Sequence, residues 1–158
     1  SGKSTLLNAL TSSDIYADDL MFATLDTASR SAVLSGGQKV IFTDTVGFIK
    51  ELPPYLIAAF SATLEEVKEA DLIIHVIDIS DANLYEKISS VEKVLKDISA
   101  QDKKIIKCYN KIDLISLELK RMMKTDLTKT TQSVFISAQN GMGLPQLKKA
   151  ITGILKTR

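Results

Sequence analysis

Short apolar runs alternate with helical patterns along most of the chain. The runs are nearly continuous in apolar residues, which is typical of parallel strands covered by helices on both faces. Such an alternation predicts crossover units that feed a parallel sheet. The expected strands are KVIFTDT (39–45), DLIIHVID (71–78), KIIKCYN (104–110) and SVFIS (133–137).

Apolar residues spaced three and four positions apart predict helices between these strands. One segment breaks the alternation: in RSAVLSGGQKVIF, Gly36-Gly37 lies between two strand-like runs, which predicts a hairpin. We therefore expect an α/β domain, with a mixed, mostly parallel sheet that contains one antiparallel hairpin strand and has helices on both faces. The helical stripes are Leu56, Phe60, Leu64 and Val67; Leu84, Ile88, Val91, Leu95 and Ile98; and Leu144, Leu147, Ile151, Ile154 and Leu155.

The first residues contain a candidate phosphate site. Gly2-Lys3-Ser4 is the closing half of the consensus G-x-x-x-x-G-K-[ST], and TLLNAL follows it as an apolar helical pattern. A helix N-terminus presents free N–H groups and a partial positive charge to phosphate oxygens. We expect Lys3 to reach the β- and γ-phosphates and the Ser4 hydroxyl to bind Mg²⁺. Ser1 and Thr5 belong to the same predicted site.

A second candidate element is DTVGF (44–48), directly behind an apolar strand. Asp44 at the strand end can hold the hydration shell of Mg²⁺, and Gly47 lets its backbone N–H approach a γ-phosphate closely. The alternative is that D-x-x-G is only a turn. Its position about forty residues after the GKS fragment favours the nucleotide site, and we include Thr45 and Val46 in it.

Motifs at the ends of two further strands predict that the base of the nucleotide is guanine. In NKID (110–113), the Asp113 carboxylate can accept from both N1–H and N2–H₂ of guanine, a pair of donors that adenine lacks. Asn110 is expected to tie this loop to the phosphate loop, and the Lys111 stem to lie over the ring. In SAQNG, Ser137 supports the loop and the Ala138 N–H can donate to guanine O6. Ile112 and Gln139 complete the predicted base site.

We interpret residues 1–158 as one GTP-binding domain that is cut within its phosphate loop. We expect a Ras-like P-loop GTPase fold, in which a central strand ahead of Ser1 would lie between those ending at Asp44 and Asp78. Its absence would leave unpaired backbone groups that each cost about 1–3 kcal/mol. The formal net charge of +1 gives no argument for wrapping nucleic acid or binding an acidic membrane. The single cysteine, Cys108, is expected to be buried, and a cytoplasmic monomer is expected.

Four segments of the chain form a specific combination: FATLD (22–26), DTVGFIKELP (44–53), AFSATLEEVKEADLIIHVID (59–78) and NKID (110–113). By these segments the chain resembles the translation-factor-like GTPases and, within them, the HflX family. The resemblance implies that Thr24 completes Mg²⁺ coordination and senses the γ-phosphate, and we group Phe22, Ala23, Leu25 and Asp26 with it. It also implies binding to the large ribosomal subunit and a role in ribosome rescue or dissociation under stress. Thr27-Ala28-Ser29 replace the usual Pro-Thr-Thr, so we expect a less rigid switch.

Intrinsic hydrolysis is expected to be slow. Ras-type enzymes place a Gln after D-x-x-G to orient the attacking water, and this chain has Phe48 there. An outside group must therefore complete a site whose catalytic residues we predict to be Lys3, Thr24 and Gly47. The resemblance implies that K⁺, held by an Asn just before Ser1, is such a group. The alternatives are a guanine-nucleotide-binding interaction module with little or no hydrolysis, and an Era- or Obg-type GTPase in ribosome assembly.

Overall fold

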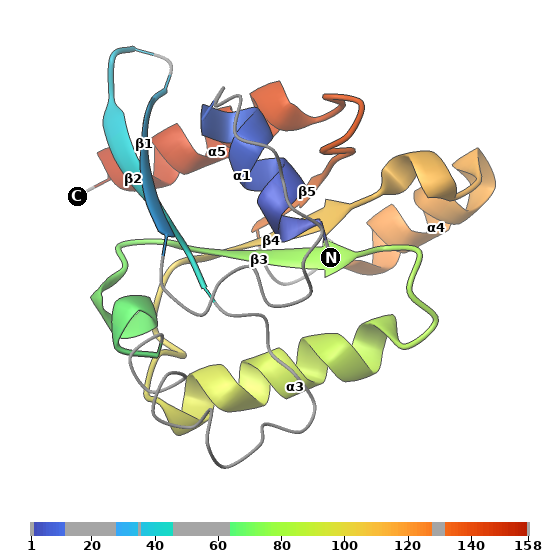
Figure 1. The fold of residues 1–158 in the computed structure, drawn as a ribbon. Coiled ribbons are helices and arrows are strands. Elements are labelled where there is room, and N and C mark those ends of the chain that lie inside the picture. The colour runs from blue at the N-terminus through green and yellow to red at the C-terminus, as the bar shows by residue number, and fades with distance from the viewer. Residues whose placement is uncertain (1, 12–27, 35, 46–63, 128–131, 158) are drawn as a thin grey trace.

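The computed structural model describes residues 2–11, 28–34, 36–45, 64–127 and 132–157 (Figure 1). Residues 64–69 are also helical. The other elements, in chain order, are α1 (Lys3–Thr11), β1 (Ala28–Val33), β2 (Lys39–Asp44), β3 (Ile73–Asp78), α3 (Leu84–Asp97), β4 (Ile105–Asn110), the 3₁₀ helix η2 (Ile112–Leu114), α4 (Leu117–Leu127), β5 (Gln132–Phe135) and α5 (Leu144–Lys156).

The predicted hairpin is confirmed. β1 pairs antiparallel with β2, in a register that runs from Ala28 opposite Asp44 to Val33 opposite Lys39. The turn between them is closed by the Leu34 N–H, which donates to the Gln38 carbonyl at 2.8 Å. Gly36 and Gly37 both have positive φ, which a glycine adopts without the penalty that a Cβ would bring.

The parallel part of the fold is also confirmed. β3 pairs with β4 and β4 with β5, all parallel, so the strand order is β3-β4-β5. In the part of the chain that the structure describes, the strands form two sheets, because β2 and β3 are not paired with each other.

Helices cover both faces of the parallel sheet, as the apolar runs predict. Figure 1 shows α1 and α5 on the side of the hairpin and α3 on the opposite side. The larger core joins α1, α5, the hairpin and one face of the parallel sheet. Two smaller clusters lie under α3, α4 and the helical residues 64–69. The most deeply buried members of the larger core are Ile106, Cys108, Ile136, Leu147 and Ile151.

Two titratable side chains inside these layers, those of His75 and Cys108, have pKa values shifted by burial. Burial, with a smaller contribution from the Lys107 ammonium, lowers the pKa of His75 to about 4, so this histidine is neutral at physiological pH. Cys108 is fully buried, as expected, and its burial raises the pKa of the thiol to about 12. Neither group lies at the strand ends where the predicted motifs gather.

The sequence pattern did not predict α4. This helix has no buried residue, and its apolar side chains Leu117 and Met122 are exposed. Its Met123 and Leu127 pack, partly buried, against one of the smaller clusters, so its apolar face is narrower than those of α3 and α5. Among the described residues, no helix is both long enough and apolar enough to cross a lipid bilayer.

Candidate functional site

The first turn of α1 presents its backbone N–H groups to one edge of the molecule. The Leu6 N–H donates to the Gly2 carbonyl at 3.0 Å and so begins the helical hydrogen bonding. The preceding N–H groups of the helix have no intrahelical acceptor, which makes such a terminus suited to an anion. Ser4 and Thr5 lie in this turn. The helix start predicted after Gly2 is therefore present.

Lys3 connects α1 to the end of β2. Its ammonium contacts both the Asp44 carboxylate and the Thr45 carbonyl oxygen. Asp44 is buried, with 8% of its surface exposed, and a buried carboxylate is stabilised by a paired cation. The fold thus brings together two motifs that lie 41 residues apart in the sequence.

Asn110, at the end of β4, joins the two remaining loops of the site. It is 2% exposed, and its Oδ1 accepts the Ala138 N–H at 2.9 Å. Its Nδ2 lies against Gly2, because a Cβ built on Gly2 would come within 2.4 Å of that atom. Gly2 also has a φ of +79°, so both space and backbone conformation require glycine there. The Ala138 N–H, expected to donate to guanine O6, donates to Asn110 in this structure.

The loop after Asn110 is held on both sides by backbone hydrogen bonds. The Ile79 N–H donates to the Asn110 carbonyl at 3.0 Å, and the Ile112 N–H donates to the Ile136 carbonyl at 3.1 Å. Lys111 lies between them in the left-handed region, with φ +67°. Asp113 follows in η2 with an exposed side chain, so its carboxylate is accessible at this edge.

Hydrogen bonds of Ser137 and the backbone conformation of Gly143 also fix the loop after β5. Ser137 is 1% exposed; its N–H donates to the Met142 carbonyl at 2.9 Å and its Oγ accepts the Asn140 N–H at 3.3 Å. Gly143 has a φ of +76°, and a Cβ there would lie 2.2 Å from the Phe135 carbonyl oxygen. Gln139 is exposed on the same loop. The loop therefore holds the Ala138 backbone in place beside Asn110.

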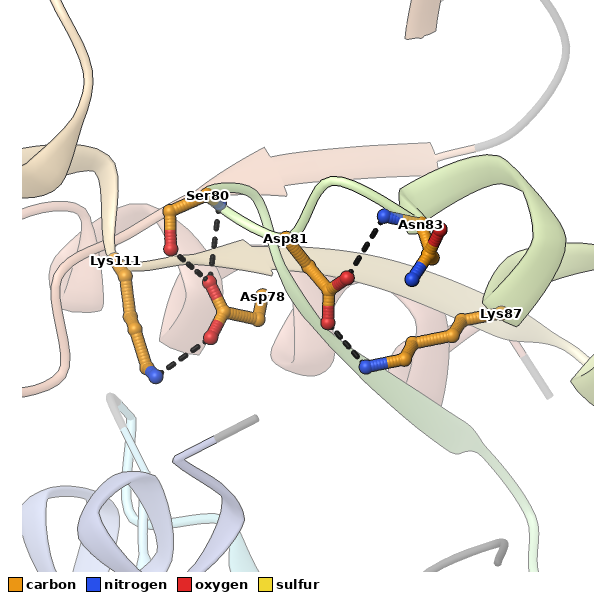
Figure 2. A network of polar contacts seen from close by, with 6 residues as sticks. All are labelled: Asp78, Ser80, Asp81, Asn83, Lys87 and Lys111. Atoms are coloured by element: carbon orange, nitrogen blue, oxygen red, sulfur yellow. Dashed lines mark hydrogen bonds and ion pairs between the residues drawn. The ribbon is translucent and has the colours of Figure 1, made fainter. Parts of the chain in front are cut away.

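A polar network beside this loop was not predicted from the sequence (Figure 2). Asp78, at the end of β3, accepts from Ser80 and from the Lys111 ammonium. Burial disfavours the charged carboxylate, but hydrogen bonds from Lys111 and Ser80 outweigh it and hold the pKa of Asp78 below its usual value. The sequence feature that could have predicted this network is an Asp at the end of one expected strand, next to the strand that carries NKID.

Several predicted site residues lie outside the described residues, and their predicted roles stay predictions. They are Ser1, Phe22, Ala23, Thr24, Leu25, Asp26, Val46 and Gly47, together with Phe48. Of the predicted Mg²⁺ ligands, Ser4 and Asp44 are described. A hydroxyl and a carboxylate are oxygen donors of the kind that Mg²⁺ prefers, so both fit that ion by their chemistry. Over the described ranges, no three His, Cys, Asp or Glu side chains gather as a metal site.

Comparison with known families gives a match over most of the chain. Residues 1–111 match the family described as "50S ribosome-binding GTPase". The chain is 50% identical to GTPase HflX of Caldanaerobacter subterraneus over 150 residues, which cover 95% of this chain and 33% of that protein. It is 41% identical to GTPase HflX of Escherichia coli, over 96% of this chain and 35% of that one. The chain thus spans about a third of the length of these curated relatives.

Solved structures show the same fold. The SsGBP and GDP complex superposes with a TM-score of 0.78 at 28% identity, over 99% of this chain and 47% of that one. A single-residue variant of Aquifex aeolicus Era bound to GDP.AlF4- superposes with a TM-score of 0.73 at 27% identity, over 95% of this chain and 52% of that one.

The Asn110 amide should be necessary for the order of the loop after β5. In Asn110→Ala, the buried Ala138 N–H loses its acceptor, at a cost of about 1–3 kcal/mol. We expect faster hydrogen exchange over the backbone around Ala138, measured by mass spectrometry. Asn140→Ala, an exposed amide on the same loop, is the matched control and should leave exchange unchanged. Equal exchange in the two variants would show that the Asn110 side chain does not hold this loop.

Proposed function

Because this chain belongs to the HflX family of GTPases, we propose that it binds GTP and hydrolyses it to GDP and phosphate. The observation that supports this most is the convergence of four motif segments: Gly2-Lys3, Asp44, Asn110 and Ala138 are linked by direct contacts at one edge of the fold. A binding crevice at the carboxyl ends of the strands is the usual ligand position in open α/β sheets.

At the phosphate end, we assign Lys3 and the first N–H groups of α1 to the phosphate oxygens. Lys3 already lies beside the Asp44 carboxylate, so one cation and one carboxylate are placed together where phosphate and metal are expected. Ser4 and Asp44 would hold Mg²⁺, which when bound neutralises charge on the phosphate oxygens. Thr24 and Gly47 remain proposed for the γ-phosphate. A K⁺ site would involve the residue ahead of Ser1.

At the base end, Asp113 would read the guanine N1–H and N2–H₂ groups, since its carboxylate is exposed at the edge of the site. The Lys111 stem would cover the ring face. Asn110 and Ala138 bind each other, and together they would line the purine edge. Ser137 fixes the loop that carries Ala138.

The large ribosomal subunit is the proposed partner, and the cytoplasm the proposed location. Support for the partner comes from the description of the matching family, "50S ribosome-binding GTPase". Because residues 1–158 span about a third of the curated relatives, the role of the whole protein in ribosome rescue or dissociation is part of the proposal. Phe48 at the position of the water-orienting Gln makes slow hydrolysis, completed by a partner, the expected mechanism.

Asp113→Asn tests the assignment of the base. An amide cannot accept from both guanine donors, so GDP affinity should fall by about tenfold or more, and preference should move partly to xanthosine diphosphate. Isothermal titration with both nucleotides measures this. Asp102→Asn, an exposed Asp before β4 at the opposite end of that strand, should bind GDP like the parent protein. An Asp113→Asn protein that keeps its full guanine preference would remove Asp113 from base recognition.

The partner proposal is tested by single-turnover hydrolysis of GTP with and without large ribosomal subunits. We expect a slow basal rate that rises severalfold or more with subunits. The position after D-x-x-G, where Ras-type enzymes have a water-orienting Gln, is occupied by the apolar Phe48. Catalytic groups supplied in trans raise GTPase rates by about 10³–10⁵ in other systems, which sets the upper scale. Small ribosomal subunits serve as the control. A fast rate that does not respond to large subunits would contradict completion of the site by this partner.

A further inference from the structure

Asp78 lies at the end of β3, directly opposite Asn110 in the parallel pairing of β3 with β4. Both of its carboxylate oxygens accept hydrogen bonds. Oδ1 accepts the Ser80 N–H at 3.0 Å and the Ser80 hydroxyl at 2.6 Å, and Oδ2 lies 2.6 Å from Lys111 Nζ. Figure 2 shows Ser80 and Lys111 approaching the carboxylate from different sides. Ser80 therefore fixes the orientation in which Asp78 meets Lys111.

Among the four residues of NKID, Lys111 is the one with a positive φ. It adopts φ +67°, a conformation that costs a residue with a Cβ about 1–2 kcal/mol. The hydrogen bonds of Ile79 to Asn110 and of Ile112 to Ile136 hold the backbone on either side. These bonds fix the direction in which the side chain leaves the loop, but they leave a long stem with several rotatable bonds. An acceptor for its ammonium restricts that freedom.

We propose that Asp78 is a positioning residue of the base site: by binding the Lys111 ammonium, it holds the Lys111 stem ready as a platform for the guanine ring. This inference rests on the proposed function. An ammonium held by a fixed carboxylate spares the nucleotide the entropy cost of ordering a lysine side chain on binding. Asp78 thus contributes to affinity without itself contacting the base.

The ion pair is better placed than an ordinary surface pair. The Asp78 side chain is 18% exposed and the Lys111 side chain 38% exposed, so water screens the pair less than a fully exposed one. The low pKa of Asp78 means that its carboxylate is ionised at neutral pH. Charge-assisted hydrogen bonds of this kind are shorter and stronger than neutral ones.

The same loop offers a matched control. Asp81 accepts the Asn83 N–H at 2.8 Å and pairs with the Lys87 ammonium, so it has the same kinds of partners as Asp78. Lys87, however, belongs to α3 and not to NKID. Figure 2 shows the two carboxylates side by side, each with its own lysine. A loss of affinity that comes only from disturbing residues 78–83 would appear in both Asp variants.

The test is a double-mutant cycle on GDP affinity, measured by calorimetry in the whole protein. Asp78→Asn keeps the size of the side chain but places an amide against the ammonium, and we expect GDP affinity to fall by about three- to tenfold, as for coupled pairs in one network. Lys111→Met keeps an unbranched stem without the ammonium, and we expect a loss at least as large. The double variant should bind GDP no more weakly than Lys111→Met alone. Asp81→Asn should bind like the parent.

The outcomes separate this inference from the proposed function. A parent protein that does not bind GDP would overturn both. A parent that binds GDP while Asp78→Asn binds equally well overturns only the positioning role. Additive losses in the double variant would also overturn it, because Asp78 would then act independently of the Lys111 ammonium. Should Asp78→Asn fail to fold, Lys111→Met decides alone: undiminished GDP affinity would contradict the inference.

Discussion

The buried amide of Asn110 is the interaction on which the arrangement of the site depends. Its oxygen accepts the Ala138 N–H from the loop after β5, and its nitrogen lies against Gly2 at the start of α1. One side chain thus joins three segments that are distant in sequence. An amide can do this because it carries an acceptor and donors on one rigid group. Its burial means that each partner left unsatisfied would be costly.

The rest of the site follows from parallel strand topology. Strands that run in one direction bring their carboxyl ends to the same edge, so Asp78, Asn110 and the loop holding Ser137 lie next to one another. The hairpin strand β2 also ends at this site, where Asp44 meets Lys3 of α1. The cations Lys3 and Lys111 each have a carboxylate partner at this edge. Charge is therefore placed in pairs at both of these positions.

Much of the fold was predictable from the sequence, because the apolar runs and helical stripes are strong. The four expected strands, the hairpin at Gly36-Gly37, and the helices α3 and α5 are all present. Helix α4 was missed: none of its residues is fully buried, and its Met123 and Leu127 are only partly buried against the core.

The side-chain contacts of the site were less predictable than its position. NKID and SAQNG indicate which loops meet, but the bond from Ala138 to the Asn110 oxygen depends on the orientation of one amide. The ion pair of Asp78 with Lys111 depends on the left-handed backbone conformation of Lys111. The sequence does not predict this conformation, because lysine rarely adopts it. Long-range polar contacts of this kind are set by the final packing of the loops.

If these loops form one site for a guanine nucleotide, hydrogen exchange on addition of GDP tests it most directly. We expect GDP to slow exchange together in three segments, residues 2–7, 110–114 and 136–142, and ADP at the same concentration to leave all three unchanged. Protection confined to one segment, or equal protection by ADP, would contradict a single guanine-nucleotide site.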